Sequence, residues 1–542
     1  MASVPVKISN LSAWLTSYAV VNTFDAQLLF QGFSEGFNLQ YTGPPGPRDA
    51  NNLKSAVQLP YVVLEKLNKE ISLGRICGPF DSPPFPDMIV SPIGLVDKKV
   101  SSESVDLADH YRLIHHLSHP EGMSINDFIP QEHSSVTYTK FDEAITMVQK
   151  LGKGAQLAKF NIKSAFRLIP VRPADFHLLG IKFQGKYFFD RCLPFGCRIS
   201  CASFEKFSTF LEWCIIKKTN SHYVIHYLDD FLLGGTPSSN HCSHVLQVSI
   251  DLFKQFGVPI ATEKTVPPST NITFLGLTID TLTMEVRIPA DKITAVTQQI
   301  QSFLTSNRKK VRVVEFQSLV GRLQFITRAI PAGRAFCRRL YDAISGQVKP
   351  YHRVRVSRGV KEDLKVWLQF LTNHNGVSVF QNEVWLSSSQ MELFTDAASS
   401  CGFGVYFQGS WAYGKWPGDW VRRDYIKDMT FLELFPVVVA LRLWAHTFQN
   451  RKVIFVCDNQ AVVSIINRQT SKNRRVMSLV RFMVTLCLKH NILFRSRHIS
   501  SHDNVIADAI SRFQWDRFRE AAPRAETEAT PLPPDIWDIW DI

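Results

Sequence analysis

The residues Tyr227-Leu-Asp-Asp230 constrain the fold of this chain more than any other feature. The flanking runs, residues 224–226 and 231–233, are apolar and rich in β-formers, so the pattern predicts a β-hairpin with two adjacent carboxylates at its turn. Adjacent acids in apolar surroundings repel each other unless a cation neutralises them, and Mg²⁺ prefers carboxylate and phosphate oxygens. Taken alone, the same four residues could also form an exposed acidic turn without a metal.

Further motifs surround this hairpin along the chain. Residues 157–170 read as a strand that runs into a tight turn, and residues 191–196 form a loop that opens a predicted helix at 203–217. Four shorter motifs complete the series, namely residues 91–99, Tyr111-Arg-Leu-Ile114, Thr262-Glu-Lys264 and Phe274-Leu-Gly-Leu277.

In this order and spacing, the motifs resemble those of reverse transcriptases. With a leader of the form Trp-x-Leu, Gly-Phe and Gly-Pro-Pro, they look most like the DIRS-type (tyrosine-recombinase) retrotransposons. The resemblance covers essentially the whole chain. It implies an α+β multidomain fold: a right-hand polymerase (fingers, palm and thumb) followed by an α/β ribonuclease H-like domain with a mixed five-stranded sheet. It also implies an RNA-directed DNA polymerase that uses Mg²⁺ or Mn²⁺, two ions per active site. The implied partners are an RNA template, a DNA primer, RNA–DNA hybrids and deoxynucleoside triphosphates.

The resemblance also implies roles for single residues. Asp229 and Asp230 would bind the catalytic metals, and Phe166 would exclude a ribonucleotide 2′-OH. The incoming nucleotide would be bound by Lys98, Arg112, Phe166, Phe195, Gly196 and Lys264. The primer end would be held by Phe274, Leu275, Gly276 and Leu277.

Position 161 departs from the family, because reverse transcriptases have an aspartate where this chain has Asn161. Two-metal phosphoryl transfer uses a carboxylate that bridges both ions, and an amide offers one neutral oxygen. Since metal stabilisation is worth roughly several kcal/mol, we expect the polymerase to be impaired by several decades of rate. Mutational decay of this copy, a deliberate change and conversion to a nucleic-acid-binding protein all remain open.

A second set of acids lies between residues 388 and 514. Asp396 lies in a predicted strand, Glu433 near the start of an apolar helix, Asp458 after another strand and Asp508 on a final helix. Each acid alone is typical of a helix cap or a surface position. Together, each ending or opening a regular element, they could hold two Mg²⁺ ions that activate water.

The order Asp–Glu–Asp–Asp and its flanks resemble the ribonuclease H family. The resemblance implies that all four acids are catalytic metal ligands and that His498 matches the family's mobile histidine, with His502 as a weaker contender. It implies hydrolysis of the RNA strand of RNA–DNA hybrids, which are recognised by shape and backbone. A catalytically silent nucleic-acid-binding relic or host-adopted protein is the alternative function.

Composition shifts divide the chain into five regions. We expect an N-terminal extension at 1–80, fingers and palm at 81–287, a mostly helical thumb and connection at 288–375, a ribonuclease H domain at 388–514, and an acidic, Pro-rich, disordered tail at 515–542. The net charge of +13 agrees with a polyanionic partner. The sequence predicts no signal peptide, membrane span or membrane partner, so we expect an intracellular protein, in cytoplasm or nucleus. The oligomeric state stays open.

Overall fold

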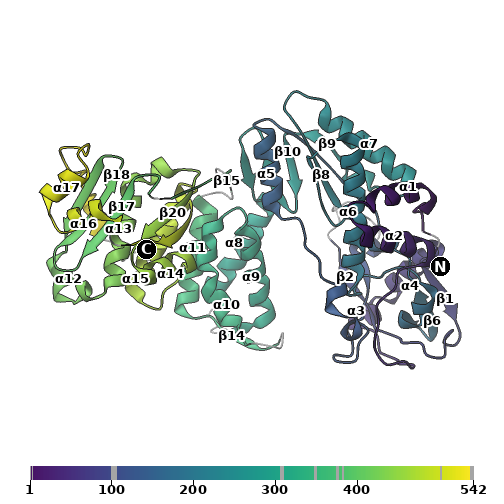
Figure 1. Ribbon diagram of the computed structural model, residues 1–542. Coiled ribbons are helices and arrows are strands. Elements are labelled where there is room, and N and C mark those ends of the chain that lie inside the picture. The colour runs from purple at the N-terminus through teal and green to yellow at the C-terminus, as the bar shows by residue number, and fades with distance from the viewer. Residues whose placement is uncertain are drawn as a thin grey trace. The chain divides into compact units, whose positions relative to one another are not determined.

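The computed structural model describes residues 2, 4–98, 107–305, 310–346, 351–373, 377–380, 384–387, 389–500 and 503–537. The chain divides into two compact units, Met1–Ile272 and Thr273–Ile542, whose elements are labelled in Figure 1. Helices and several small sheets alternate in both units, which confirms the α+β multidomain class.

The centre of the first unit is a four-stranded sheet in the order β7-β8-β4-β9. Its strands are β4 (Gln156–Asn161), β7 (Val224–Tyr227), β8 (Asp230–Gly235) and β9 (Val266–Ser269). Helices α6 (Ser200–Thr219) and α7 (His241–Phe256) contact this sheet and each other. The rings of Phe160 on β4 and Phe231 on β8 are both buried and stack at 5.0 Å, so the strands that lead to the acidic turn are fixed by core packing.

The first 40 residues belong to the same core. Helices α1 (Ile8–Tyr18) and α2 (Thr23–Glu35) pack on α6, where Tyr18 lies 5.4 Å from Phe210 and Phe33 lies 4.8 Å from Phe207, measured between ring centroids. The expected N-terminal extension is therefore built into the core of the first unit, because its aromatic and aliphatic side chains complete that core.

A smaller core joins most of the remaining elements before residue 200, whereas α5 contacts β8 of the central sheet. Its strands form a three-stranded antiparallel sheet, β1-β6-β5, and a separate hairpin, β2-β3. Helices α3 and α4 cover these strands with Ala56, Val62 and Leu67. The bounds are α3 Lys54–Gln58, α4 Pro60–Ser72, β1 Ile76–Phe80, β2 Ile93–Asp97, β3 Tyr111–His115, α5 Phe141–Leu151, β5 Gly180–Phe183 and β6 Lys186–Asp190.

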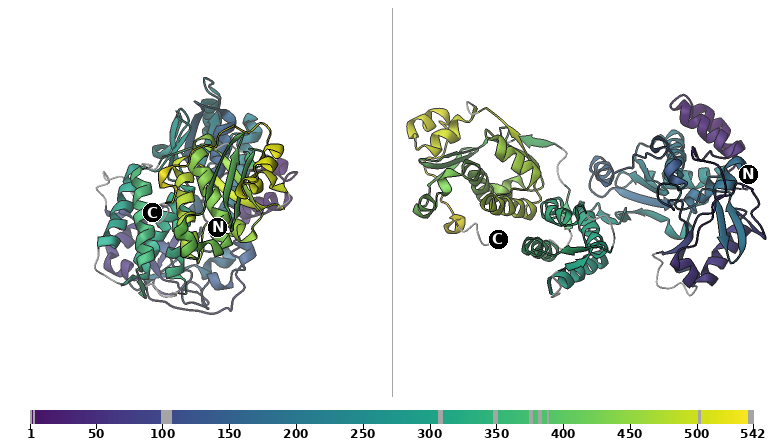
Figure 2. Two further views of the ribbon diagram at one scale, coloured as in Figure 1. Left: turned by 90° about the vertical axis from the view of Figure 1, so that its left-hand side faces the viewer. Right: turned by 90° about the horizontal axis from the view of Figure 1, so that it is seen from below.

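The second unit begins with a small sheet and a helical bundle. The sheet has the order β10-β11-β12-β15, and helices α8 to α11 pack side by side (Figures 1 and 2). Trp367 of α11 is fully buried. A two-stranded ribbon, β13-β14, contacts α9. The bounds are β10 Asn271–Phe274, β11 Leu277–Asp280, β12 Glu285–Arg287, α8 Ala290–Thr305, β13 Lys310–Arg312, α9 Val313–Ile326, α10 Arg338–Ile344, β14 Arg353–Arg355, α11 Arg358–Asn373 and β15 Val377–Val379.

Beyond residue 384 the strands form two sheets of three, where the sequence analysis expected one mixed sheet of five. One sheet, β17-β18-β19, is antiparallel, and the other, β16-β20-β21, is parallel. The expectation was wrong because a turn closed by Ser387 and Gln390 separates β16 from β17. The bounds are β16 Trp385–Ser387, β17 Leu393–Ala398, β18 Gly402–Phe407, β19 Ser410–Lys415, β20 Lys452–Cys457 and β21 Leu493–His498.

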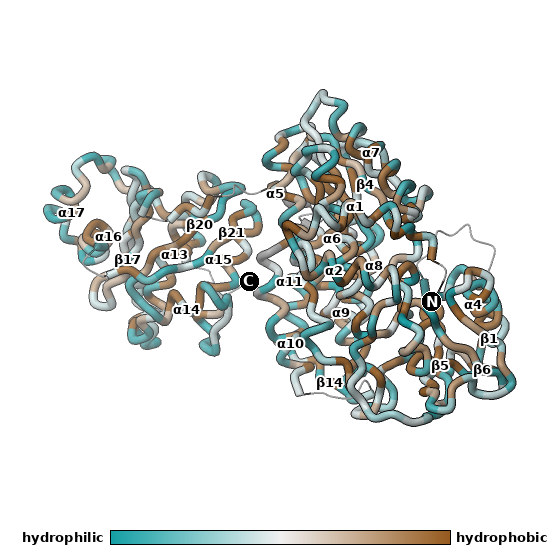
Figure 3. Tube along the Cα trace, turned by 45° about the vertical axis from the view of Figure 1, so that its right-hand side comes forward, coloured by the Kyte–Doolittle hydropathy of each residue, from teal (hydrophilic) through white to brown (hydrophobic). Residues whose placement is uncertain are grey.

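Helix α13 (Met429–Trp444) is the core helix of this region and is buried along nearly its whole length. The stretch Met429–Phe448 is apolar (Figure 3) and long enough to cross a membrane. However, 78% of its most apolar window is buried inside the fold. The other helices are α12 (Gly418–Arg422), α14 (Gln460–Arg468), α15 (Arg474–Lys489), α16 (Val505–Ser511) and α17 (Trp515–Ala521).

The C-terminal tail is ordered as far as residue 537, and the expectation of a disordered tail was wrong for these residues. Residues 515–521 form α17, and Trp537 stacks on Phe435 of α13 at 5.4 Å. Arg442 pairs with Asp535 at 2.9 Å. The buried aromatic surface outweighs the Pro- and Glu-rich composition that suggested disorder.

Candidate active sites

The Tyr227–Asp230 segment forms the hairpin that the sequence predicts. Tyr227 pairs with Asp230, so Leu228 and Asp229 alone form the turn, and Leu228 adopts a φ of 52°. Two-residue hairpins favour such left-handed conformations because they match the strand twist. A leucine with a positive φ is strained, so the surrounding structure must hold the backbone of this turn in place.

Asn161 lies beside these acids. It is the last residue of β4, directly opposite Asp230 in the sheet register, and its side chain hydrogen-bonds with Asp229. Because an ionised carboxylate can only accept, the amide N–H of Asn161 donates in this bond. The position that carries an acid in reverse transcriptases thus presents the positive end of an amide to Asp229.

Burial raises the pKa of both hairpin acids. The pKa of Asp229 is raised although Lys264, Arg112 and Asn161 each act to lower it. Burial, with repulsion from Asp229, raises the pKa of Asp230 to about 6 against the attraction of Lys159 and Lys264. The Oδ1 atom of Asp230 is buried, and none of the described residues donates a hydrogen bond to it. The two carboxylates are incompletely neutralised, and one oxygen of Asp230 has no hydrogen-bond donor among the described residues, so the pair fits a divalent cation. Asn161 would add at most one neutral oxygen ligand to such an ion.

Several predicted nucleotide-binding residues lie together. The guanidinium of Arg112 lies 4.7 Å from the ring centroid of Phe195, and the ring of Phe166 lies 5.3 Å from the same ring. Gly196 has a φ of 116°, and a Cβ there would lie 2.0 Å from the backbone oxygen of His115. The loop therefore requires glycine at this point, as expected for a close backbone approach.

The two predicted lysines differ in position. Lys264 acts on the pKa of both Asp229 and Asp230, so it lies within electrostatic reach of the hairpin. Lys98 is exposed just after β2, and its backbone N–H donates to the oxygen of His110 at 2.7 Å. Within the described residues, no contact joins Lys98 to the acids, and the chain that follows it, 99–106, is not described.

The predicted primer-binding motif forms the turn between β10 and β11. Leu275 and Gly276 have φ values of 46° and 80°, as in a two-residue hairpin, while Phe274 and Leu277 are buried. Lys292 of α8 donates to the oxygen of Gly276 at 2.7 Å. The turn is thus held by the helical bundle, and its role at a primer stays a prediction.

The four acids of the second site come together from four different parts of the fold. Asp396 lies in β17, Glu433 in α13, Asp458 just after β20 and Asp508 in α16. Burial, together with repulsion from the other three acids, raises the pKa of Glu433 to about 9. Burial likewise raises the pKa of Asp396 to about 6, with Asp508 and Asp458 adding to the effect. The acids therefore share one low-dielectric site and are incompletely neutralised.

Possible metal ligands lie close together at this site. One ligand atom each from Glu433, Cys457 and Asp458 lies within 4.8 Å of the others. The carboxylates of Glu433 and Asp458, with Asp396 near enough to raise the pKa of Glu433, fit a divalent cation that prefers oxygen ligands. Burial raises the pKa of the Cys457 thiol to about 12, so this side chain is a neutral thiol and a poor ligand for such an ion. Sequence reasoning missed Cys457, although it directly precedes Asp458 at the end of β20. His498 ends β21, and its Nε2 lies 3.0 Å from the backbone oxygen of Asp458, so it is brought to the site. His502 lies outside the described residues.

Asp508 differs from the other acids because arginines hold it. Arg512 and Arg517 donate to its two oxygens at 2.7 and 2.6 Å. Burial raises the pKa of Asp508, but the two arginines outweigh burial and keep the pKa below its usual range. Ser511 donates to Asp396 at 2.6 Å. Sequence reasoning missed these neighbours, although the spacing of Asp508 and Arg512 is that of a helical ion pair.

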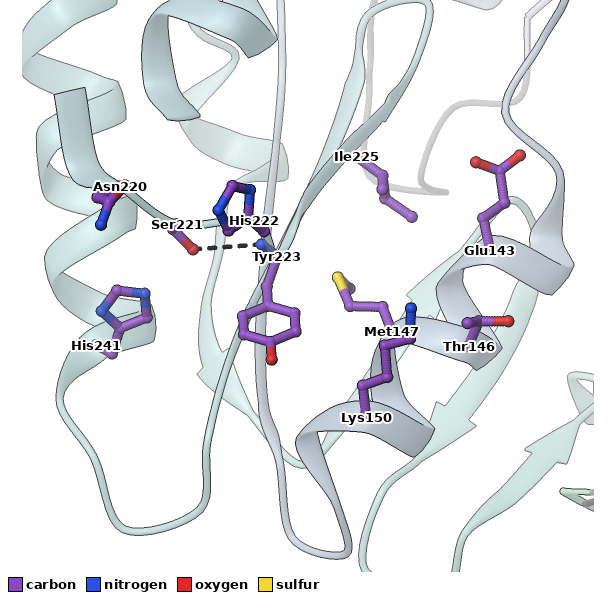
Figure 4. Close-up of a pocket in the computed structure, with 10 residues that line it drawn as sticks. All are labelled: Glu143, Thr146, Met147, Lys150, Asn220, Ser221, His222, Tyr223, Ile225 and His241. Carbon is purple, nitrogen blue, oxygen red and sulfur yellow. Dashed lines mark hydrogen bonds between the residues drawn. The ribbon is translucent and has the colours of Figure 1, made fainter. Parts of the chain in front are cut away.

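A separate hollow of about 480 Å³ lies at the opposite end of β7 from the acidic turn (Figure 4). It is lined by residues of α5, of the segment 220–225 and by His241 of α7. Its residues are mostly uncharged, and the hydrogen bond drawn within it joins Ser221 to the backbone of Tyr223 at 3.4 Å. None of the predicted site residues lines this hollow.

Residues 98–279 match the family described as reverse transcriptase (RNA-dependent DNA polymerase). The genome polyprotein of Petunia vein clearing virus is 22% identical over 376 residues, and the Tf2-3 transposon polyprotein of Schizosaccharomyces pombe is 21% identical over 374. Each alignment covers 68% of this chain, but the chain spans only 16% and 26% of these relatives.

Among solved structures, the foamy viral protease–reverse transcriptase in complex with double-stranded DNA aligns with a TM-score of 0.47 at 14% identity, over 92% of this chain and 98% of that one. The same protein in complex with an RNA/DNA hybrid aligns with a TM-score of 0.46 at 14% identity, over 92% and 64%. Residues 98–279, which contain Asn161 and the Asp229–Asp230 hairpin, are therefore a reverse transcriptase domain with relatives in viral and transposon polyproteins.

Proposed function

We propose that this protein combines an RNA-directed DNA polymerase with a ribonuclease H that degrades the RNA of RNA–DNA hybrids, and that it serves a retrotransposon of the DIRS type. RNA template, DNA primer, hybrid and deoxynucleoside triphosphates are the partners, and the protein acts inside the cell. The observation that carries the nuclease half is the gathering of four acids around Glu433, whose pKa is raised to about 9.

At the second site, the chain's own residues would hold the metal, orient one of the acids and carry a proton during hydrolysis. Asp396, Glu433 and Asp458 would hold Mg²⁺ or Mn²⁺, which supplies Lewis-acid stabilisation of the phosphate and an activated water. Ser511 and Asn504 orient Asp396 through bonds of 2.6 and 3.5 Å. The imidazole of His498, beside Asp458, is placed to carry a proton to or from the reacting oxygens.

At the first site, Asp229 and Asp230 would hold the metal, and Arg112 with Phe195 would receive the triphosphate and sugar of the nucleotide. Asn161 weakens this site in two ways. It removes one negative charge, and its amide N–H occupies Asp229. We therefore propose that the polymerase is impaired and the nuclease is not.

A catalytically silent nucleic-acid-binding relic or host-adopted protein is the second candidate, and Asn161 is the observation that favours it, for the polymerase half alone. Hybrid cleavage separates the two candidates. The full chain is incubated with a labelled RNA–DNA hybrid and Mg²⁺ or Mn²⁺, beside Asp396→Asn and the matched change Asp230→Asn. The proposal expects metal-dependent cleavage of the RNA strand that is lost in Asp396→Asn and kept in Asp230→Asn. Binding without cleavage by the unchanged chain would favour the second candidate.

A further inference from the structure

A buried network of charged side chains lies behind the predicted nucleotide-binding residues of the first unit. The guanidinium of Arg167 is at its centre and contacts two carboxylates, Glu70 of α4 at 2.8 Å and Asp190 at the end of β6 at 2.7 Å. The other oxygen of Asp190 lies 3.1 Å from Nδ1 of His115 on β3, and Nε2 of that ring lies 3.1 Å from the backbone oxygen of Gly180. The network therefore joins α4, β6 and β3 in surroundings where electrostatic contacts are strong.

The charges of this network balance each other. Burial acts to raise the pKa of Asp190, but Arg167 and His115 outweigh burial and keep the pKa below its usual range. Apolar side chains of the same volume would often be at least as stable as a buried ion pair, so stability alone does not call for charges here. What a guanidinium adds is geometry, because its planar fork binds several partners in fixed directions.

Arg167 also holds the loop that carries Phe195. Its Nη1 donates to the backbone oxygens of Cys192 and Leu193 at 3.1 and 3.4 Å. Phe166 directly precedes Arg167 in a short 3₁₀ helix, and its ring lies 5.3 Å from that of Phe195. One buried side chain is therefore bonded to the loop and adjacent in sequence to the residue predicted to exclude a 2′-OH.

His115 holds the same loop from the side of β3. Its backbone N–H donates to the oxygen of Phe195 at 3.0 Å, and its own backbone oxygen is the atom that a Cβ at Gly196 would meet. Arg112, three residues earlier on β3, lies over the ring of Phe195. Because the imidazole of His115 belongs to the network, the network ties β3 to the loop as well.

We infer that Arg167, Asp190 and His115 are positioning residues that set how strongly the polymerase prefers deoxynucleoside over ribonucleoside triphosphates. The inference rests on the proposed function, because it takes Phe166 as the residue that excludes the 2′-OH. The three side chains act through Phe166 and Phe195, whose separation they fix. A displacement of about 1 Å near a reacting centre can change a rate about 100-fold, so a small shift of Phe166 is enough to alter the preference.

The test uses the full chain with Asn161→Asp, in which the polymerase is expected to work. Asp190→Asn removes the charge that joins the network, and Asp175→Asn is the matched control. Asp175 is also a buried acid of the first unit, but it pairs with Arg172 at 2.9 Å and accepts from the backbone of Leu39 at 2.8 Å. Primer extension with dATP and with ATP gives the ratio of the two kcat/KM values, from which any unfolded fraction cancels.

Asp190→Asn should lower the dATP-to-ATP ratio at least about 10-fold, whereas Asp175→Asn should change it less than about 2-fold. Glu70→Gln removes the partly exposed partner of Arg167 and should lower the ratio by a smaller factor. This milder variant decides the question if Asp190→Asn loses the native circular dichroism spectrum. An unchanged ratio in Asp190→Asn and Glu70→Gln, or an equal fall in Asp175→Asn, would overturn the inference.

A binding measurement separates this inference from the proposed function. On a primer that ends in a dideoxynucleotide, the concentration of dATP or ATP that stabilises the complex in a mobility-shift gel reports nucleotide binding without catalysis. A preference for dATP that falls in Asp190→Asn would support the network even if no variant extends a primer. Extension with an unchanged ratio contradicts the inference alone. If the chain forms no nucleotide-dependent complex and extends no primer, the polymerase half of the proposed function and the inference are both wrong.

Discussion

The two carboxylate sites of this chain differ in how their negative charge is balanced. At the first site two acids share a half-buried turn with the amide of Asn161, and Lys264 lies within electrostatic reach. At the second site four acids meet, and within the described residues the direct arginine contacts go to Asp508 alone among them. The pKa of Glu433 rises to about 9 there, whereas that of Asp230 rises to about 6.

The comparison between the two sites indicates how the amide of Asn161 changes the charge balance of the first site. An aspartate at position 161 would remove a hydrogen-bond donor from Asp229 and add a third negative charge to the turn. Both changes make the metal-free site less stable and a bound cation more favourable, as in the second site. Asn161 thus relieves the repulsion that normally drives metal binding. We therefore expect the first site to bind a metal ion more weakly than it would with an aspartate at position 161, which is the basis of the proposed impairment of the polymerase.

The largest expected effect comes from removing the carboxylate of Glu433, an expected metal ligand of the second site. In the Asn161→Asp protein, Glu433→Gln should lower hybrid cleavage by roughly 10³-fold, because loss of a metal ligand costs several kcal/mol of transition-state stabilisation. Primer extension should be unchanged, as Glu433 belongs to the second site. Both rates can be read from one gel, and a parallel loss of extension would contradict the independence of the sites.

A change at Gly196 should affect the first site alone. A Cβ there meets the oxygen of His115 at 2.0 Å and sits on a φ of 116°, so Gly196→Ala should cost about 1–3 kcal/mol and raise the KM for the incoming nucleotide in the Asn161→Asp protein. Gly185→Ala is the matched control, because its φ is 76° and no atom lies within 4 Å of the added Cβ. Hybrid cleavage should survive both changes. Equal behaviour of the two variants would show that the loop tolerates a side chain.

His226 should make the stability of the first unit depend on pH. It is buried on β7 between Glu205, at 3.3 Å, and Glu212, and these acids raise its pKa to about 9 against the effect of burial. The stabilisation is complete below the unfolded value near 6.5 and is lost as the pH rises through 9. Denaturant unfolding between pH 6 and 10 should show this fall, and His226→Gln should flatten it. A native profile that stays flat would refute the charged pairing.

The smallest expected effect comes from Arg512, one of the two arginines that contact Asp508. Arg512 lowers the pKa of both Asp396 and Glu433, so Arg512→Gln should raise both values. Since the ionised acids bind the metal, the acidic limb of the pH profile for hybrid cleavage should move to higher pH. Lys427→Gln, an exposed cation paired with Asp424, serves as the control. An unmoved limb would mean that Arg512 acts on Asp508 alone.

Local patterns were enough to predict the hairpin of the first site, because the runs around Asp229 and Asp230 are apolar and rich in β-formers. The sequence could not show that Asn161 donates to Asp229 or that Arg517 reaches Asp508, because these contacts depend on how separate elements meet. The prediction for the tail was wrong for a related reason. Composition predicted disorder, whereas Trp537 stacks on Phe435, which lies just over a hundred residues earlier in the chain.

The most direct test is primer extension on an RNA template by the chain as it stands and by the Asn161→Asp variant, with hybrid cleavage followed in the same tubes. The difference between the two sites predicts that the Asn161→Asp variant extends the primer at least about 10²-fold faster than the unchanged chain. Cleavage should be equal in both. Equal extension by the two proteins would contradict the claim that the amide at position 161 disables the first site.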